Sequence, residues 1–149
     1  MRFMIIVKAT TATEAGLMPQ ETLLAAMASY HEQLALAGVL LDANGLQPSA
    51  KGWRIRWHEG QRSVVDGPFA ETTELIAGYT LIQVRSRDEA MEWARRFPAP
   101  HGEHADAEIE LRQLFELSDF EPGVSVQRFD ALERRSSPSA PASATLQRE

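Results

Sequence analysis

The 149-residue sequence contains no cysteine. It therefore has no disulfide framework, no thiol nucleophile and no thiolate ligand for a metal. It also lacks an apolar run close to the roughly 20 residues that a membrane-spanning helix needs. The apolar stretch at residues 3–7 is too short for the core of a signal peptide. We therefore expect a cytoplasmic protein with no membrane partner.

The chain also has no excess of basic residues, since its formal net charge is -6. Proteins that bind nucleic acids usually concentrate basic residues in a patch that contacts phosphates, so we expect no nucleic-acid partner. Arg54, Arg56 and Arg62 do gather in one region. We interpret them as the solvated face of a sheet.

The chain is long enough for one domain with a proper core. We expect this domain to span residues 1–120, because the composition beyond it changes to serine, proline and alanine, most clearly at residues 136–143. Such a segment buries too little apolar surface to offset the entropy lost on ordering. We therefore expect residues 121–149 to form a mostly flexible tail, with a short helix at residues 124–135.

The spacing of apolar residues predicts two helices and four sheet strands, with a β-hairpin inserted between the second and third strands. The expected sheet strands lie at residues 2–8, from residue 39 onward, at 78–84 and at 108–115. The expected helices lie at residues 19–37 and 86–97, and the hairpin at residues 53–65. Residues 10–18 are expected to form a loop. The order strand, helix, strand, strand, helix, strand is the split βαβ, or ferredoxin-like, arrangement of an α+β protein.

Helices of this arrangement cover only one face of the sheet, and the other face needs a partner. The strand at residues 2–8 carries bulky residues on both alternating sets of positions, which is typical of a central strand with both faces covered. Tyr79, Leu81, Ile109 and Leu111 leave apolar surface on either assignment of the faces. We therefore expect homodimerisation through the open face.

The segment at residues 64–78 is the best candidate for a functional site. Asp66-Gly67-Pro68 is a strong turn signal that ends the preceding strand. Asp66 is either a cleft carboxylate that serves as a general base or anchors a cationic ligand, or an Asx-turn acceptor that holds the corner. Phe69 follows directly and is expected to line the same cleft.

Further candidates flank this turn. Glu71 and Glu74 are three residues apart and share a face if the segment makes a helical turn. Thr72 fits a helix cap better than a nucleophile, because no motif places a base beside it. Lys51 is able to pair with one of the acids or to bind an anion. His31, at the edge of the apolar stripe of the first helix, fits a hydrogen-bonded structural histidine better than an acid/base catalyst.

Two other groups of residues carry atoms or rings that are suited to binding. His101, His104 and Asp106 carry atoms suited to a divalent metal, but their glycine-containing loop argues against a preformed site. We therefore expect no metal, and no motif indicates an organic cofactor. Trp53 and Trp57 share one face of the hairpin and fit core or dimer contacts better than a stacking platform.

Residues 66–72, Asp-Gly-Pro-Phe-Ala-Glu-Thr, resemble the DGPF-motif branch of the YCII-related family. Supporting blocks are Gly-Val-Leu-Leu at 38–41, Gly-Leu-Gln-Pro-Ser at 45–49, Glu-Leu-Ile-Ala-Gly-Tyr at 74–79 and Glu-Ile-Glu-Leu-Arg at 108–112. The resemblance covers residues 1 to about 120. It implies a dimeric α+β barrel, in which two ferredoxin-like subunits pack their sheets together and leave a cleft in each.

The resemblance leaves two functions open. Members of the wider group are proposed to be enzymes with a His-Asp pair in the cleft, but His31 stands closer to Gly38 than the family's histidine, so we do not assign His31 and Asp42 as a catalytic pair. One hypothesis is a dimer whose cleft binds a small molecule, with acid/base catalysis that needs no organic cofactor. The alternative is a non-catalytic regulatory or interaction module, since the DGPF branch is often encoded beside alternative sigma factors.

Overall fold

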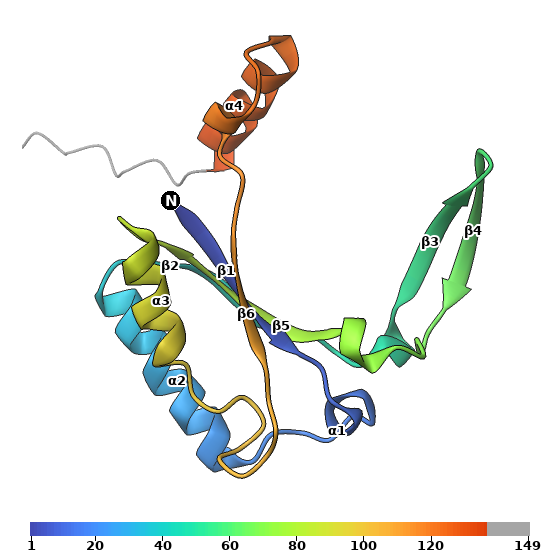
Figure 1. The fold of residues 1–149 in the computed structure, drawn as a ribbon, viewed down its shortest axis with the longest axis vertical. Coiled ribbons are helices and arrows are strands. Elements are labelled where there is room, and N and C mark those ends of the chain that lie inside the picture. Colours follow the sequence, from blue (N-terminus) through green and yellow to red (C-terminus); the bar gives the residue numbers. More distant parts are fainter. Residues whose placement is uncertain (137–149) are drawn as a thin grey trace, which may run out of the picture. The chain divides into compact units, whose positions relative to one another are not determined.

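The computed structural model describes residues 1–136 and shows an α+β protein that divides into two compact units (Figure 1). The first unit is Met1–Leu114, and the second begins at Phe115. The predicted flexibility of the tail concerns in large part residues 137–149, which lie outside the described residues.

The first unit is built on a four-stranded antiparallel sheet in the order β2-β5-β1-β6. Its strands are β1 (Arg2–Lys8), β2 (Leu40–Gly45), β5 (Ile76–Gln83) and β6 (Ile109–Gln113). Helix α2 (Glu21–Leu36) connects β1 to β2, and helix α3 (Arg87–Arg95) connects β5 to β6. The order of these elements is the predicted one, with β1 central in the sheet.

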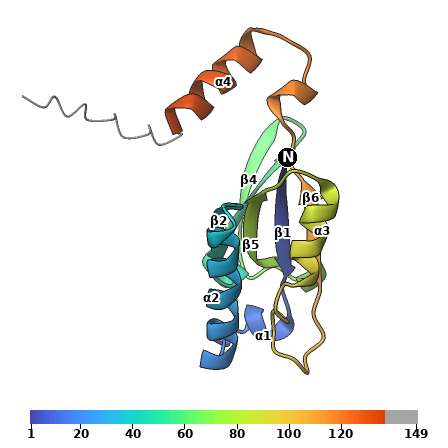
Figure 2. The same ribbon diagram turned by 90° about the vertical axis from the view of Figure 1, so that its left-hand side faces the viewer.

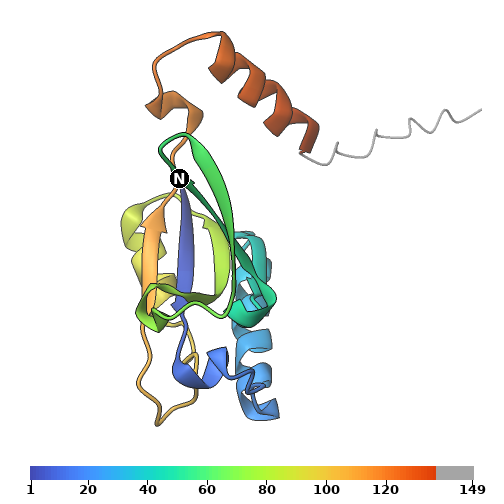
Figure 3. The ribbon, with the colours of Figure 1, turned by 90° about the vertical axis from the view of Figure 1, so that its right-hand side faces the viewer.

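The core lies between one face of this sheet and the two helices, which run over that face side by side (Figure 2). Ile5, Leu34 and Ile82 are its largest fully buried side chains. The rest of the buried apolar set is Phe3, Tyr30, Val39, Val84, Ala90 and Trp93. Because paired residues share a face, the other face carries Met4, Ile6, Tyr79 and Leu81, which no helix of the first unit covers (Figure 3).

Both helices form where the sequence predicts them, but α2 begins two residues after the predicted residue 19 and α3 ends two residues before the predicted residue 97. Gly38 adopts a φ of 73° directly after α2, a left-handed conformation that glycine takes without strain. The Ser86 side chain accepts a hydrogen bond from the backbone N–H of Glu89 at the start of α3. The predicted loop at residues 10–18 is partly wrong, because one helical turn, α1 (Thr11–Glu14), forms there behind a Thr10 cap.

The predicted hairpin consists of β3 (Trp53–His58) and β4 (Gln61–Asp66) and forms a separate two-stranded sheet. Its two turn residues, Glu59 and Gly60, have φ angles of 49° and 76°. Two consecutive positive φ angles are typical of the type I′ turn, whose twist matches that of the paired strands. The hairpin extends away from the four-stranded sheet, on the side opposite to α2 and α3 (Figure 1).

Short 3-10 turns complete the first unit: η1 (Ser49–Lys51) precedes the hairpin and η2 (Thr72–Glu74) follows it. The second unit contains η3 (Leu117–Asp119) and helix α4 (Val124–Ser136), where the sequence predicts a helix. The rings of Phe115 and Phe120 pack with centroids 5.3 Å apart. None of the helices in residues 1–136 is long and apolar enough to span a membrane.

Candidate functional site

The turn after β4 is docked on the turn before β3. The backbone N–H of Gly67 donates to the carbonyl of Gly52 at 3.0 Å, and the N–H of Phe69 donates to Ser49 Oγ at 3.0 Å. A Cβ atom at Gly67 would lie 1.7 Å from the Ser49 carbonyl oxygen, so only glycine allows this approach. The Gly67–Pro68 peptide bond is cis. The two turns thus close the base of the hairpin.

Glu14 holds this closure in place from α1. Ser49 Oγ donates to Glu14 Oε2 at 2.5 Å, and the Ser49 N–H donates to both carboxylate oxygens at 3.2 and 3.1 Å. The Ser49 hydroxyl therefore links the Glu14 carboxylate to the Phe69 backbone. Sequence reasoning missed both Glu14 and Ser49, because no local pattern joins residues 35 positions apart.

The predicted carboxylates of this segment do not gather into one cluster. Asp66 pairs with Trp53 across the base of the hairpin, and its exposed side chain makes no hydrogen bond or ion pair within residues 1–136. The corner is therefore held by backbone N–H groups and Ser49, and not by an Asx turn at Asp66. Glu71 and Glu74 are also exposed and make no such contact in the described residues.

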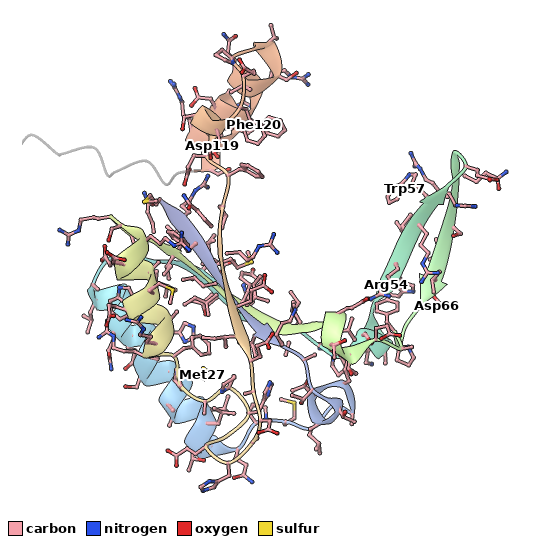
Figure 4. The ribbon with its side chains drawn as sticks, in the orientation of Figure 1. Met27, Arg54, Trp57, Asp66, Asp119 and Phe120 are labelled. Carbon is pink, nitrogen blue, oxygen red and sulfur yellow. The ribbon has the colours of Figure 1, made fainter. Side chains whose placement is uncertain are left out.

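The remaining candidates of the turn are engaged differently. Arg54 lies at the base of the hairpin (Figure 4). Its guanidinium is 4.0 Å from the centroid of the Phe69 ring, which is a cation–π contact. Thr72 does not cap η2 with its side chain, because Glu71 occupies the cap position and no side-chain cap bond forms there. Lys51 is exposed at the end of η1, and within residues 1–136 it makes no ion pair.

His31 lies between α2 and the covered face of the sheet, away from the hairpin. Its Nδ1 is 2.7 Å from the Met27 carbonyl oxygen, so it carries the proton and donates. Its Nε2 is 2.8 Å from Oγ1 of Thr80, a residue only 2% exposed. With both ring nitrogens engaged, His31 satisfies the hydroxyl of a buried threonine, and the geometry favours a structural role.

Tyr30, the neighbour of His31, is another polar group of the core. Its hydroxyl donates to the Trp93 carbonyl oxygen at 2.7 Å and so ties α2 to α3. Burial raises the pKa of Tyr30 to about 12, an effect that the positive charge of Arg96 partly opposes. The hydroxyl therefore stays protonated at neutral pH and serves packing.

Asp42 and His31 lie on opposite faces of the sheet, so they do not form a pair. A β-bulge at Leu41 shifts the register of β2, and Asp42 then pairs with Leu81 while Ala43 pairs with Thr80. Asp42 consequently shares the open face with Leu81, whereas His31 contacts Thr80 on the covered face.

Asp42 instead joins a hydrogen-bonded cluster with Asn44 and Tyr79 on the open face. The Tyr79 hydroxyl donates to Asp42 Oδ2 at 2.8 Å, and Asn44 Nδ2 donates to Asp42 Oδ1 at 3.0 Å and to the Tyr79 oxygen at 3.1 Å. The three side chains come from the neighbouring strands β2 and β5. Sequence reasoning did not place Asn44 or Tyr79 in a site, because the cluster exists only in the bulged register.

Charged residues flank the opposite side of this face. Glu110 of β6 pairs with Ile6 of β1. Its Oε2 lies 3.6 Å from Lys8 Nζ, and its Oε1 lies 3.1 Å from Arg112 Nη1. The open face thus has an apolar centre, formed by Met4, Ile6 and Leu81, between a polar cluster on β2 and β5 and an ion-pair group on β1 and β6. This arrangement suits a ligand with polar and apolar parts.

The histidine-rich loop is engaged with the backbone. His101 Nε2 lies 3.0 Å from the carbonyl oxygen of Lys8, and His104 is exposed. Among residues 1–136, no group of three or more histidine, aspartate or glutamate side chains is arranged to hold a metal ion.

The fold and the open face define a ferredoxin-like α+β domain with an inserted hairpin. The model of the YCII-related domain matches residues 1–114, so the chain belongs to the YCII-related family. A protein of Rhizobium meliloti (strain 1021), described as uncharacterized, is 42% identical over 59 residues, which are 40% of this chain and 48% of that protein. The match thus spans about half the length of this curated relative.

Proposed function

We propose that the protein is a homodimer whose two sheets pack face to face, as in the dimeric α+β barrel that the DGPF-motif branch implies. The open face supports this proposal, because Met4, Ile6 and Leu81 place apolar side chains in its centre. The helices α2 and α3 of the first unit cover only the other face (Figure 3). A second sheet at the usual spacing of about 10 Å would remove this apolar surface from water.

We further propose that the Asp42–Asn44–Tyr79 cluster binds a small molecule in the cleft that the dimer creates. The observation that carries this proposal is a carboxylate hydrogen-bonded to a phenol and an amide beside the apolar centre of the open face. Asp42 Oδ1 already accepts from Asn44 Nδ2 and from the backbone N–H of Ala43, whereas Oδ2 accepts only from Tyr79. Since a carboxylate oxygen accepts two hydrogen bonds, Oδ2 keeps acceptor capacity for a ligand. The ligand class is therefore a molecule with N–H, O–H or cationic groups.

Acid/base catalysis without an organic cofactor is an extension of this binding function. Asp42 is able to accept a proton from a bound ligand, and the Tyr79 hydroxyl is able to donate one, provided that both reach the reacting atoms. Asp66, Glu71 and Glu74 remain a second candidate set, because their carboxylates have no partner within residues 1–136.

Screening of a metabolite collection by thermal shift, followed by calorimetry on the hits, tests the site. Asp42→Asn and Tyr79→Phe should each weaken binding of a hit at least about tenfold, because each removes one charge or donor from the cluster. Asp66→Asn and Glu71→Gln serve as matched variants at the turn. Loss of binding in the turn variants alone would move the site from the sheet to the turn.

Sedimentation tests the dimer separately. The expected mass is close to twice the 16.6 kDa of one chain. A monomer at micromolar concentration contradicts the packed sheets and the cleft that depends on them.

A non-catalytic interaction module is the second candidate function, and helix α4 favours it. Val124, Phe129 and Leu132 of this helix are exposed large apolar side chains. Under this hypothesis the helix binds a regulatory protein such as an alternative sigma factor. Phe129→Ser should abolish co-purification of that factor with the full chain, while Gln127→Ser, on the same helix, should not.

A further inference from the structure

The β3–β4 hairpin carries a largely exposed apolar face, on which the Arg62 guanidinium lies 5.7 Å from the centroid of the Trp57 ring. Trp53, Ile55 and Trp57 alternate along β3, and Val64 pairs with Ile55 on the same face. Trp53 and Trp57 are 69% and 66% exposed, and Ile55 and Val64 are 54% and 66% exposed. Since a tryptophan buries up to about 250 Å², the two indoles alone expose roughly 300 Å². Apolar patches of a few hundred Å² on a protein surface often mark an interaction site.

The hairpin also has weak support of its own. A two-stranded hairpin is only marginally stable in water unless a face packs on something else. Apart from the docked turns at its base, the hairpin stands away from the sheet (Figure 1). Packing of the indole face against another surface would supply the missing stabilisation.

We infer that the β3–β4 hairpin is a dimerisation arm, whose indole face packs on the second copy of the chain. The inference rests on the proposed dimer. The hairpin projects on the open-face side of the sheet, opposite to α2 and α3 (Figure 1). A partner that covers the open face therefore meets the hairpin as well. In a two-fold dimer each copy both extends an arm and receives one.

The charge of the hairpin also favours a second copy of the chain as its partner. The hairpin holds three arginines, Arg54, Arg56 and Arg62, against two acids, whereas the whole chain has 15 basic and 21 acidic residues. The arm is thus more basic than the body on which it packs. Arg62 lies on the indole face, because it pairs with Trp57, and it has no ion-pair partner within residues 1–136. The carboxylates of Glu71 and Glu74 also lack an ion-pair partner there. A second copy therefore offers carboxylates to the face of the arm that packs on it.

Tryptophan fluorescence tests the arm, because the chain has three tryptophans and Trp93 is buried in the core. The full chain is measured with acrylamide quenching across a dilution series that sedimentation assigns to dimer and monomer. We expect both hairpin indoles to be shielded in the dimer and quenchable in the monomer. Trp53→Phe and Trp57→Phe assign the signal to each position.

Substitutions on the two faces of β3 provide the second readout. Ile55→Ser should weaken dimerisation at least about tenfold, since the change acts twice in a two-fold dimer. Arg56→Ser, the neighbouring position on the other face, should change the dissociation constant less than about threefold. Neither residue belongs to the core, so both variants should keep the wild-type fold.

The outcomes separate the arm from the dimer itself. A dimer whose hairpin indoles stay fully quenchable overturns the arm and leaves the packed sheets standing. Equal dissociation constants for Ile55→Ser and Arg56→Ser overturn it too. A wild-type monomer at micromolar concentration overturns both proposals. Shielding of the indoles only after lipid vesicles are added would make a membrane the occupant and refute the arm.

Discussion

Substitution of Gly67 by alanine tests the closure at the base of the hairpin. The new Cβ would lie 1.7 Å from the carbonyl oxygen of Ser49 and 2.6 Å from its carbonyl carbon, so the two backbones must separate. Separation breaks the Gly67-to-Gly52 and Phe69-to-Ser49 hydrogen bonds. At about 1 kcal/mol for each bond, and with some strain from overpacking, we expect a loss of about 2–3 kcal/mol.

The loss should be local, because the hairpin base opens without unfolding the core. Hydrogen exchange of the Phe69 amide should therefore accelerate about 30-fold, the factor that corresponds to about 2 kcal/mol. Gly52→Ala is the matched control, since its Cβ would meet the same Ser49 oxygen at an ordinary 3.5 Å. Equal exchange rates at Phe69 in the two variants would refute the docked turn.

Three further substitutions have expected results. Ser49→Ala should lower the free energy of unfolding, measured by urea denaturation, by about 1–2 kcal/mol, because the Ser49 hydroxyl makes two hydrogen bonds. An unchanged midpoint of the urea unfolding curve would contradict this. His31→Ala should cost about 1–3 kcal/mol by leaving the buried Thr80 hydroxyl unpaired, and adding Thr80→Val should recover part of the loss while ligand binding stays intact. Tyr30 ionises near pH 10 when unfolded and near pH 12 when folded, so stability should be complete below pH 10 and fall by about 2–3 kcal/mol as the pH rises to 12. Tyr30→Phe should remove this loss of stability at alkaline pH. If the free energy of unfolding falls equally with pH in the wild type and in the variant, Tyr30 is not its cause.

The elements of the sheet and the large helices follow from local patterns. Apolar residues on both alternating positions of residues 2–8 indicate a central strand, and β1 is central because β5 and β6 flank it. Gly38 and Ser86 mark helix ends by their conformational and capping preferences. Helix α1 escaped prediction because one turn is too short to show a helical period. Its signal was the pair of threonines at 10 and 13, which bond to each other.

The contacts of the turn depend on the tertiary structure and could not be read from the sequence. The signature Asp-Gly-Pro correctly predicts where β4 ends. What holds the corner is Ser49, 20 residues before Phe69, and Glu14, 35 residues before Ser49. The requirement for glycine at position 67 also comes from this neighbour, because the close contact is with the Ser49 backbone.

The composition of the open face depends on the bulge at Leu41. Leu40 pairs with Ile82 and Asp42 pairs with Leu81, so β2 has one extra residue, Leu41, between two neighbouring pairs of the ladder. Without the extra residue, Asp42 would pair with Thr80 and point to the face that His31 contacts. With the bulge, Asp42 lies on the open face instead, where it accepts a hydrogen bond from the Tyr79 hydroxyl. A single inserted residue thus separates Asp42 from His31, and it assigns the carboxylate to the face on which dimerisation and ligand binding are proposed.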